Sequence, residues 1–484
     1  MTGDDRDQRR FADMVRIVAI LTCAVLAACA TRRDVAPPAA VPPPTADLTP
    51  LFQRGCYTCL EQVYVEADAR GLRQQAFEAA TLLTLRSKEL GLPFEAWFER
   101  ARERAPLDAS AAVYLEIVAA IPQALLSGNR DVLQELQARQ RARTRLPDWR
   151  DALRAGSGSD LFRAYLDVSL VCAFGRLRED DGSFSEAPEP FAQSPLYQYR
   201  IGICDGSHAD RLKAVRAQDA EFVDADFALG RYALGDPSNP DPETGLKHLA
   251  AAAQAFPASP AIVATIGDVH RGWEEWEPAL AAYDAAIAVS PNHPEAMLGR
   301  TISLSRLLRS REAIDAATRM IELGQWRIGE AYYWRAWNHL LRGDIQLARR
   351  DADSARPLMA NAALFVLSGT IEWRLRRLES AEHEFQQALT MDLGECEAAF
   401  NLGVVRGELG KESEALAAFQ QARQCYELSI QLRRTAIETI RSGPGTAMAR
   451  TRAAAVHERV LADLEDRRSE VMRALEVLAK LKPS

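Results

Sequence analysis

The sequence predicts an all-α chain: a superhelix (solenoid) of antiparallel helix pairs followed by a long C-terminal helical segment. The main observation is a 34-residue period between about residues 260 and 425. A period of this length is typical of tandem units that each consist of one helix pair. The other two observations are apolar residues at helical spacing before the array and a long apolar stripe after it.

The period is visible as Gly, Ala, aromatic and Ala at fixed spacing in three units. These positions are Gly267, Ala279, Tyr283 and Ala286; Gly369, Ala381, Phe385 and Ala388; and Gly403, Ala415, Phe419 and Ala422. We expect the small residues to let the two helices approach closely and the aromatic residue to fill the gap to the next unit. In the first unit Pro291 follows and ends the second helix.

This order of positions resembles the tetratricopeptide repeat (TPR) family. Two units with weaker matches fit between the clear ones, at about residues 294–327 and 329–361. A degenerate unit at 226–257, with turn-forming residues inserted at 235–242, precedes them. The resemblance therefore implies an array over residues 226–425, with one degenerate and five further repeats. It indicates the fold strongly and the function weakly, because a solenoid is a surface on which different binding sites are built.

The resemblance also indicates where a partner would bind, because certain repeat positions in this family face the concave groove. Mapped onto this sequence, they give a tentative binding set of Arg271, Arg306, Tyr333, Trp337, Trp373, Arg374 and Phe400. Tyr, Trp and Arg are the residue types of binding hot spots. An alternative is that the chain's own N- or C-terminal helices fill the groove. The family's carboxylate-clamp pattern is absent, since Asn401 lacks the accompanying lysines.

The N-terminus is typical of an export signal. Basic residues precede a short apolar run at 17–28, which ends in Leu-Ala-Ala before Cys29. This ending resembles a bacterial lipobox, which implies that residues 1–28 are removed and that Cys29 carries a lipid. Ala30, which is not Asp, favours the outer membrane by the same resemblance. Ordinary secretion or a buried apolar helix is the alternative. Residues 29–50 are rich in Pro and Ala and are expected to be an extended tether.

Two further helical regions flank the array. Residues 51–225 are expected to be irregular helices, with possible divergent repeats, including helices at about 93–104, 108–126, 129–143 and 161–178. Residues 426–484 are expected to form one helix to about 441 and a long one over 446–481. The long helix either caps the open end of the solenoid or pairs with a partner or a second copy.

Six cysteines remain once Cys23 is removed with the signal and Cys29 is lipidated. An even number in an oxidising compartment favours disulfides. The economical pairing joins neighbours in sequence: Cys56 with Cys59, Cys172 with Cys204, and Cys396 with Cys425. The CxxC at 56–59 also permits a redox site or a zinc site, although no βαβ pattern and no second ligand pair accompany it.

No catalytic pattern stands out. The sequence contains no HExxH, no GxSxG and no GxxxxGK motif. We therefore expect no enzyme, no metal and no cofactor. The net charge of −8 and the absence of a basic block argue against nucleic acid.

These observations favour a lipid-anchored, periplasm-facing scaffold or assembly factor that binds a protein of the cell envelope. A periplasmic module that binds a peptide or glycan in the aromatic groove is the alternative. A degenerate envelope enzyme centred on residues 51–230 is a third hypothesis.

Overall fold

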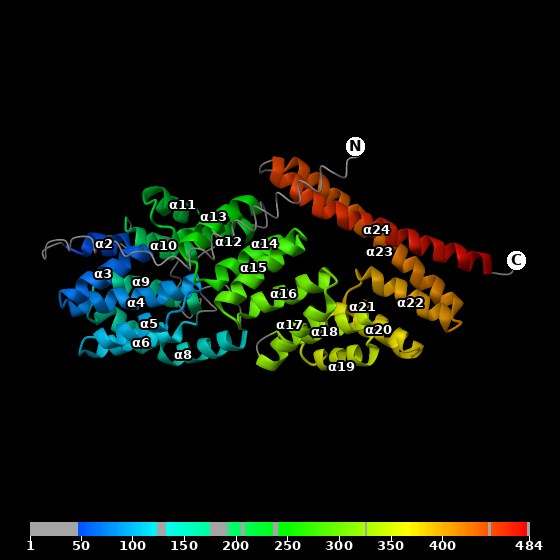
Figure 1. The fold of residues 1–484 in the computed structure, drawn as a ribbon, viewed down its shortest axis with the longest axis horizontal. Helices are drawn as coiled ribbons and strands as arrows, with labels where there is room; N and C mark the ends of the chain where they lie inside the picture. The colour runs from blue at the N-terminus through cyan, green and yellow to red at the C-terminus, as the bar shows by residue number, and fades with distance from the viewer. Residues whose placement is uncertain are drawn as a thin grey trace. The chain divides into compact units, whose positions relative to one another are not determined.

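The computed structural model describes residues 47–122, 132–174, 191, 193–204, 209–235, 241–324, 327–443 and 447–481. Every regular element within these residues is a helix (Figure 1), which confirms the predicted fold class. Residues 49–484 form one compact unit. The expected signal peptide, Cys29 and most of the expected tether lie outside the described residues. At the end of that tether the prediction was wrong, because helix α2 (Thr49–Arg54) already begins at Thr49.

The repeat array consists of consecutive antiparallel helix pairs. They are α14 (Pro260–Gly272) with α15 (Trp276–Val289), α16 (Pro294–Arg306) with α17 (Ser310–Leu323), α18 (Ile328–Arg342) with α19 (Ile345–Ala355), α20 (Ala362–Arg374) with α21 (Leu378–Met391), and α22 (Cys396–Glu408) with the first half of α23 (Glu412–Ser442). The pair α12 (Asp224–Gly235) and α13 (Pro242–Ala255) precedes them at the position of the degenerate unit. The chain is thus a TPR-like solenoid.

The glycines of the period lie where the sequence pattern expects close helix contact. A methyl group added to Gly369 would come within 2.7 Å of the Phe385 ring, and one added to Gly403 within 2.8 Å of Phe419. In the first repeat the Tyr283 ring fills the same place beside Gly267. Each of these three aromatic side chains is buried. In these three repeats the ring therefore packs directly against a glycine, where there is no room for a larger side chain.

The turns inside the pairs share one backbone feature. A residue with positive φ follows the first helix of every pair: Glu274, Leu308, Gly343, Arg376 and Gly410. Three of the five carry side chains, although this conformation costs roughly 1–2 kcal/mol for an L-residue. The turn geometry is therefore imposed by the repeat as a whole and not by a glycine.

The N-terminal helices are irregular in length. They are α3 (Tyr57–Ala69), α4 (Arg73–Leu90), α5 (Glu95–Arg104), α6 (Ala109–Ala120), α8 (Val132–Ala155), α9 (Asp160–Phe174), α10 (Pro195–Cys204) and α11 (Ala209–Gln218). The helix expected to end near residue 143 continues to Ala155 through an internal Pro147. Trp149 and Leu153 are buried beyond the proline, and this burial outweighs the backbone hydrogen bond that proline cannot donate.

A buried charge network lies at the centre of the N-terminal helices. The guanidinium of Arg86 donates to Asp224 at 2.5 Å, and Arg200 donates to Glu89 at 2.6 Å. All four side chains are buried. The Arg86 guanidinium also lies over the Tyr199 ring, at 3.7 Å from its centroid. These contacts join α4 to α10 and to α12, so they connect the irregular region with the start of the repeat array.

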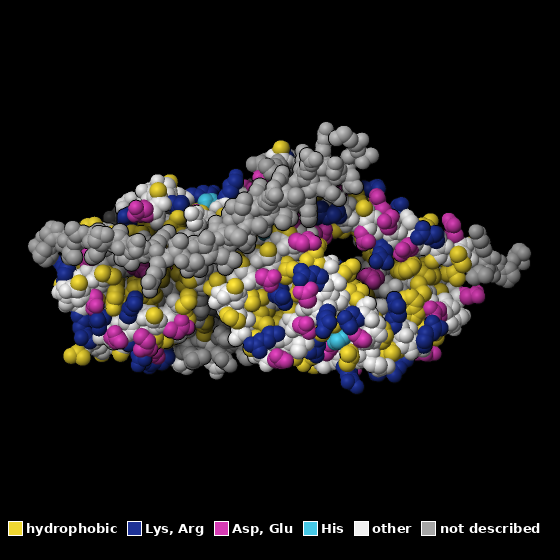
Figure 2. Space-filling view, viewed as in Figure 1, with side chains coloured by type: hydrophobic (Ala, Val, Ile, Leu, Met, Phe, Trp, Pro, Cys, Tyr) yellow, Lys and Arg dark blue, Asp and Glu magenta, His cyan; other side chains and the backbone are white. Residues whose placement is uncertain are grey.

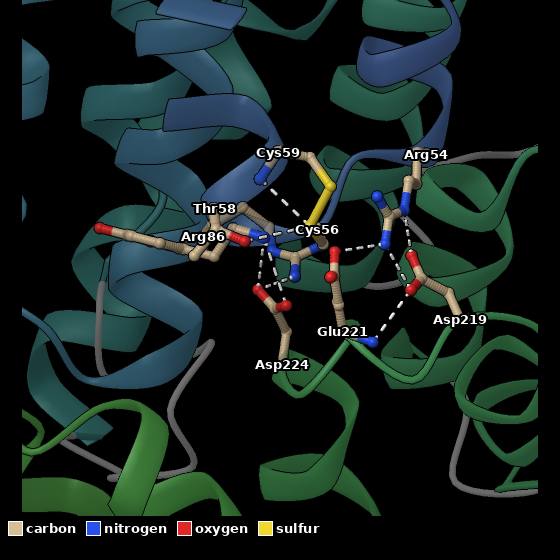
Figure 3. Close-up of a disulfide and its surroundings, with 9 residues drawn as sticks. Arg54, Cys56, Thr58, Cys59, Arg86, Asp219, Glu221 and Asp224 are labelled. Atoms are coloured by element: carbon tan, nitrogen blue, oxygen red, sulfur yellow. Dashed lines mark hydrogen bonds and ion pairs between the residues drawn. A yellow bond between two sulfur atoms is a disulfide. The ribbon is translucent and has the colours of Figure 1, made fainter. Parts of the chain in front are cut away.

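The disulfide of the CxxC sequence lies beside this network (Figure 3). Cys56 and Cys59 are joined, and both are buried. The Cys56 sulfur accepts a hydrogen bond from the Cys59 backbone N–H and so acts as the N-cap of α3. The carboxylate of Asp224 accepts from the Tyr57 N–H at the same helix start, at 3.1 Å. In this structure the cysteine pair therefore fixes the beginning of a helix.

The other two cysteine pairs are also joined. Cys172 is joined to Cys204, with 5.1 Å between their Cα atoms, and Cys396 is joined to Cys425, with 5.4 Å between theirs. The second bond links the start of α22 to α23, across the open end of the last helix pair.

The C-terminal segment is a long helical hairpin. Helix α23 runs without a break from the last repeat to Ser442, and α24 (Ala447–Leu481) packs along it (Figure 1). Val471 of α24 is fully buried in the hydrophobic core of the last repeat. Among the described residues, no helix combines the length and the apolar character needed to cross a membrane.

Candidate binding face of the repeat array

The first helices of the repeats form a continuous row. Helix α14 contacts α16, α16 contacts α18, α18 contacts α20, and α20 contacts α22. The second helices are not in comparable contact with one another. The side of a solenoid on which neighbouring helices lie closer is its inner side, so the first helices line the concave face. All seven residues of the predicted binding set belong to these helices.

Arg306 is the most distinctive residue of this face. Its side chain is exposed, and its guanidinium lies between two indole rings, 5.8 Å from the centroid of Trp276 and 5.7 Å from that of Trp334. Within the described part of the chain, no carboxylate lies within ion-pair distance of Arg306. Both rings are within cation–π range of the guanidinium, and aromatic neighbours limit the conformations of an Arg side chain. The site therefore presents one positioned cation to solvent.

Trp276 and Trp334 were not part of the predicted set. Trp276 is the first residue of a second helix, and Trp334 follows the predicted Tyr333 directly. The family pattern assigns neither of them to the groove. The only signal in the sequence was the high density of Trp and Arg around these positions. Their role depends on how successive repeats are rotated, which a period does not give.

Tyr333 and Trp337 lie one helical turn apart on α18 and are half-buried against the core of the third repeat. Burial is the main cause that raises the pKa of the Tyr333 phenol to about 12. Arg306 opposes this rise, whereas Glu397 and Glu395 add to it. The phenol is therefore neutral at physiological pH.

Arg271, at the start of the array, forms its hydrogen bonds within its own repeat. Its Nη2 donates to Asp268 at 3.0 Å and its Nε to the Tyr283 hydroxyl at 3.1 Å. The Tyr283 hydroxyl in turn donates to Asp268 at 2.7 Å. Three polar groups thus satisfy one another, and Arg271 is less suited to bind a partner than Arg306.

The far end of the predicted set has a different character. Trp373 donates its indole N–H to Glu408 at 2.9 Å, and Arg374 beside it is exposed. Phe400 packs against Phe419, with 5.7 Å between the ring centroids, in the core cluster that also contains Val471 of α24. The C-terminal helix α24 thus packs on the last repeat along α23, its second helix, whereas Arg306 remains exposed.

The other end of α24 contacts the first repeat. The guanidinium of Arg452 lies 3.8 Å from the centroid of the Trp273 ring, and its Nε donates to Glu275 at 3.0 Å. Arg459 donates to the Trp273 carbonyl at 2.8 Å and to Glu274 at 3.1 Å. Glu274 is the positive-φ residue of its turn. The hairpin is thus attached to the last repeat through its core and to the first through charged contacts.

A cavity of 630 Å³ lies elsewhere, between the C-terminal ends of α4 and α6, the start of α5, and the starts of α14 and α16. Lys88 lines it, and burial lowers the pKa of this lysine to about 8. However, the Lys88 ammonium donates to the carbonyls of Val118 and Ile121, at 2.7 Å each. Lys88 therefore caps the C-terminal end of α6, which is a structural role.

Charged side chains on the surface are mixed in sign. On the face shown in Figure 2, acidic and basic groups alternate over the repeats with apolar areas between them. Such a surface produces no strong field of one sign. A partner of this face would therefore have to be recognised by individual positioned side chains such as Arg306.

Comparisons with known proteins add little to this account. No family model matches the sequence, and no curated protein matches it. A TPR protein from Parabacteroides merdae is 14% identical with a TM-score of 0.39, over 54% of this chain and 99% of that chain. YrrB, a TPR protein with an unusual peptide-binding site, is 20% identical with a TM-score of 0.31, over 37% and 91%. The APC/C heterotetramer Cut9–Hcn1 is 16% identical with a TM-score of 0.36, over 86% and 91%.

These identities and TM-scores are too low to support conclusions about binding or activity. The TPR-like fold of this chain rests on its own helix pairs and their period.

Proposed function

We propose that this chain is a non-catalytic scaffold that binds another protein of the cell envelope through the concave face of its repeats. The observation that carries the proposal is Arg306, an exposed cation held between Trp276 and Trp334 on the row of first helices. Tryptophan and arginine are the residues that most often dominate binding energy at protein interfaces.

We further propose that the scaffold is anchored by a lipid on Cys29 and faces the periplasm, in the outer membrane. The support is the sequence before Cys29, with its basic start, its short apolar run and its small residues. The three disulfides are in keeping with an oxidising compartment. A lipid anchor and a Pro-rich tether would hold the array at a distance from the membrane surface.

Crosslinking in intact cells tests the scaffold function. Cells expressing the tagged full chain are treated with a reversible crosslinker, and the chain is purified under denaturing conditions. We expect one envelope protein in stoichiometric amount. Recovery of the chain alone, or turnover of an envelope substrate by the purified chain, would contradict the proposal.

A pair of cysteine substitutions tests the anchor. Cys29→Ala should release the chain from the membrane fraction, because the acceptor of the lipid is lost. Cys23→Ala is the matched control, since Cys23 lies within the segment that is expected to be removed. Equal membrane association of both variants would show that Cys29 carries no anchor.

A further inference from the structure

A polar cleft lies between the third and the fourth repeat, beside their second helices. It has a volume of 300 Å³ and is lined by residues of α19, of α20 and of α21 with the turn before it. Only two of its lining residues are apolar, and the others are charged residues or serines. On α20 the lining includes Ser368 and Glu372, whereas Trp373 and Arg374 of the predicted binding set are not part of it. The cleft is therefore distinct from the concave binding face proposed above.

The Ser368 hydroxyl at the floor of this cleft is buried and has no partner. The residue is 5% exposed, and its Oγ makes no hydrogen bond with any described residue. The other buried serines and threonines of the array donate to a backbone carbonyl, as Thr301, Ser303 and Ser305 do to the carbonyl four residues earlier. An unsatisfied buried hydroxyl is unfavourable, so Ser368 points to a group that enters the cleft and bonds to it.

Two charged side chains of the same cleft also have unsatisfied atoms. The buried Oε2 of Glu372 accepts no hydrogen bond, and the nearest basic group printed beside it, Nη1 of Arg377, is 3.5 Å away. The buried Nε of Arg349 lies 3.0 Å from the other Glu372 oxygen but is not aligned for a hydrogen bond. The cleft thus combines an unsatisfied hydroxyl, an unsatisfied acceptor and an unsatisfied donor.

The charges that line the cleft balance one another. They are three arginines and three carboxylates: Arg349, Arg356, Arg377, Asp353, Glu372 and Glu384. A phosphate would be repelled by the carboxylates and could not donate to Glu372, and an ammonium group would be repelled by the arginines. A hydroxyl group both donates and accepts hydrogen bonds. A neutral ligand with several hydroxyl groups can therefore satisfy all three kinds of atom.

We propose that the cleft between α19, α20 and α21 binds a neutral sugar. One hydroxyl group of the sugar pairs with Ser368, a second donates to Glu372, and a sugar oxygen accepts from the guanidinium of Arg349. The inference goes beyond the proposed scaffold function and does not depend on it, because the concave face takes no part. The sugar is either a free monosaccharide or one unit of a glycan chain.

Saturation-transfer difference NMR on the purified full chain tests this inference, because the method detects weak binding of small ligands. The neutral probes are D-glucose and N-acetyl-D-glucosamine, each also as its trisaccharide, maltotriose or chitotriose. Glucose 6-phosphate and glucosamine keep the glucose ring and add one charged group of either sign. We expect at least one neutral probe to bind, and the two charged probes to bind more weakly than glucose. Tighter binding of a trisaccharide supports a glycan chain, and equal binding supports a free sugar.

A pair of serine substitutions places the sugar in the cleft. Ser368→Ala should weaken binding of the neutral probe about fivefold, as the loss of one hydrogen bond does. Ser354→Ala is the matched control, because Ser354 is exposed on α19 and does not line the cleft. Both variants should remain folded by circular dichroism, since Ser368 loses no hydrogen bond to the protein and Ser354 is exposed.

Three results would overturn the inference. If no neutral probe binds, the Ser368 hydroxyl is satisfied by water only. If a probe binds the native and the Ser368→Ala chains equally, its site is not this cleft. If glucose 6-phosphate or glucosamine binds more tightly than glucose, the balance of charges does not select a neutral ligand. The crosslinking experiment in cells decides separately whether the scaffold function holds.

Discussion

The repeat array and the N-terminal helices hold their helices together with opposite kinds of side chain. In the array an aromatic ring packs against a glycine, as Phe385 does against Gly369. In the N-terminal region the centre holds charges, with Arg86 against Asp224 and Arg200 against Glu89. The array also holds one buried carboxylate, Asp351, paired with Arg335 at 2.7 Å, but the contact of a ring with a glycine recurs from repeat to repeat. Arg306 on the concave face has no ion pair among the described residues. The N-terminal region uses its arginines internally. This difference is why we propose a binding face in the array and not in the N-terminal region.

The largest expected effect comes from breaking the buried network. Arg86→Ala leaves Asp224 and Glu89 buried without this cation, which should destabilise the N-terminal helices by about 3–5 kcal/mol. Urea unfolding followed by hydrogen exchange measures the loss and its location. Arg309→Ala, which breaks an exposed pair with Glu312 at 2.6 Å, is the control and should leave the unfolding midpoint unchanged. An equal effect of both substitutions would remove the distinction between the two regions.

The next effect concerns the disulfides at the two ends. The Cys396–Cys425 bond closes a sequence separation of 29 residues, whereas Cys56–Cys59 closes a separation of 3. By loop entropy, replacing the first pair with serine should cost about 3–4 kcal/mol and replacing the second about 2 kcal/mol. Thermal unfolding of the two double variants gives the comparison. A larger loss for the Cys56–Cys59 pair would show that its capping of α3 dominates over chain entropy.

A pH dependence follows from His293 at the junction of the two regions. Its Nδ1 accepts the Ala296 N–H at 3.3 Å as the N-cap of α16, and burial lowers the pKa of His293 to about 4. The unfolded chain binds this proton below about pH 6.5 and the folded chain only near pH 4, so stability falls as pH falls between these values. The loss should approach about 1.4 kcal/mol per pH unit at most. Urea midpoints at pH 7 and pH 5 measure it, and His293→Asn should reduce the difference. An unchanged difference in that variant would contradict the assignment.

The last effect concerns the glycines of the array. Gly369→Ala should destabilise by about 1–3 kcal/mol, because the added methyl group meets the buried Phe385 ring. Gly407, in helix α22, has open space around it. Gly407→Ala is the matched control and should stabilise by about 0.5–1 kcal/mol through helix propensity. Destabilisation by both substitutions would indicate that glycine is needed for a reason other than close helix contact.

The array was predictable because the same contact between two helices recurs in successive repeats. The spacing of Gly369, Phe385 and their equivalents 34 residues later already contains the contact that closes each pair. Helix α8 was predicted too short, because Pro147 is a strong local signal for the end of a helix. The burial of Trp149 beyond it depends on tertiary packing, which no local sequence pattern contains. The partners of Arg86 lie up to 138 residues away in sequence, so no local pattern contains them either.

The binding face was predictable only in part. The family positions led to Arg306 and Tyr333, which lie on the row of first helices. They did not lead to Trp276 and Trp334, because these rings reach Arg306 from neighbouring repeats. They also did not separate Arg306 from Arg271, whose charge is used by Asp268 within one repeat. The repeat positions of the family identify the concave face. The side-chain contacts then show which residue on that face is available to bind a partner.

Site-specific photo-crosslinking in intact cells tests the central claim that the concave face is the binding face. A photoreactive amino acid replaces Arg374 on a first helix or Arg311 on a second helix; both positions are exposed. The account predicts a crosslinked partner protein from position 374 and none from position 311. A partner captured only from position 311, or only internal crosslinks from position 374 to α24, would contradict it.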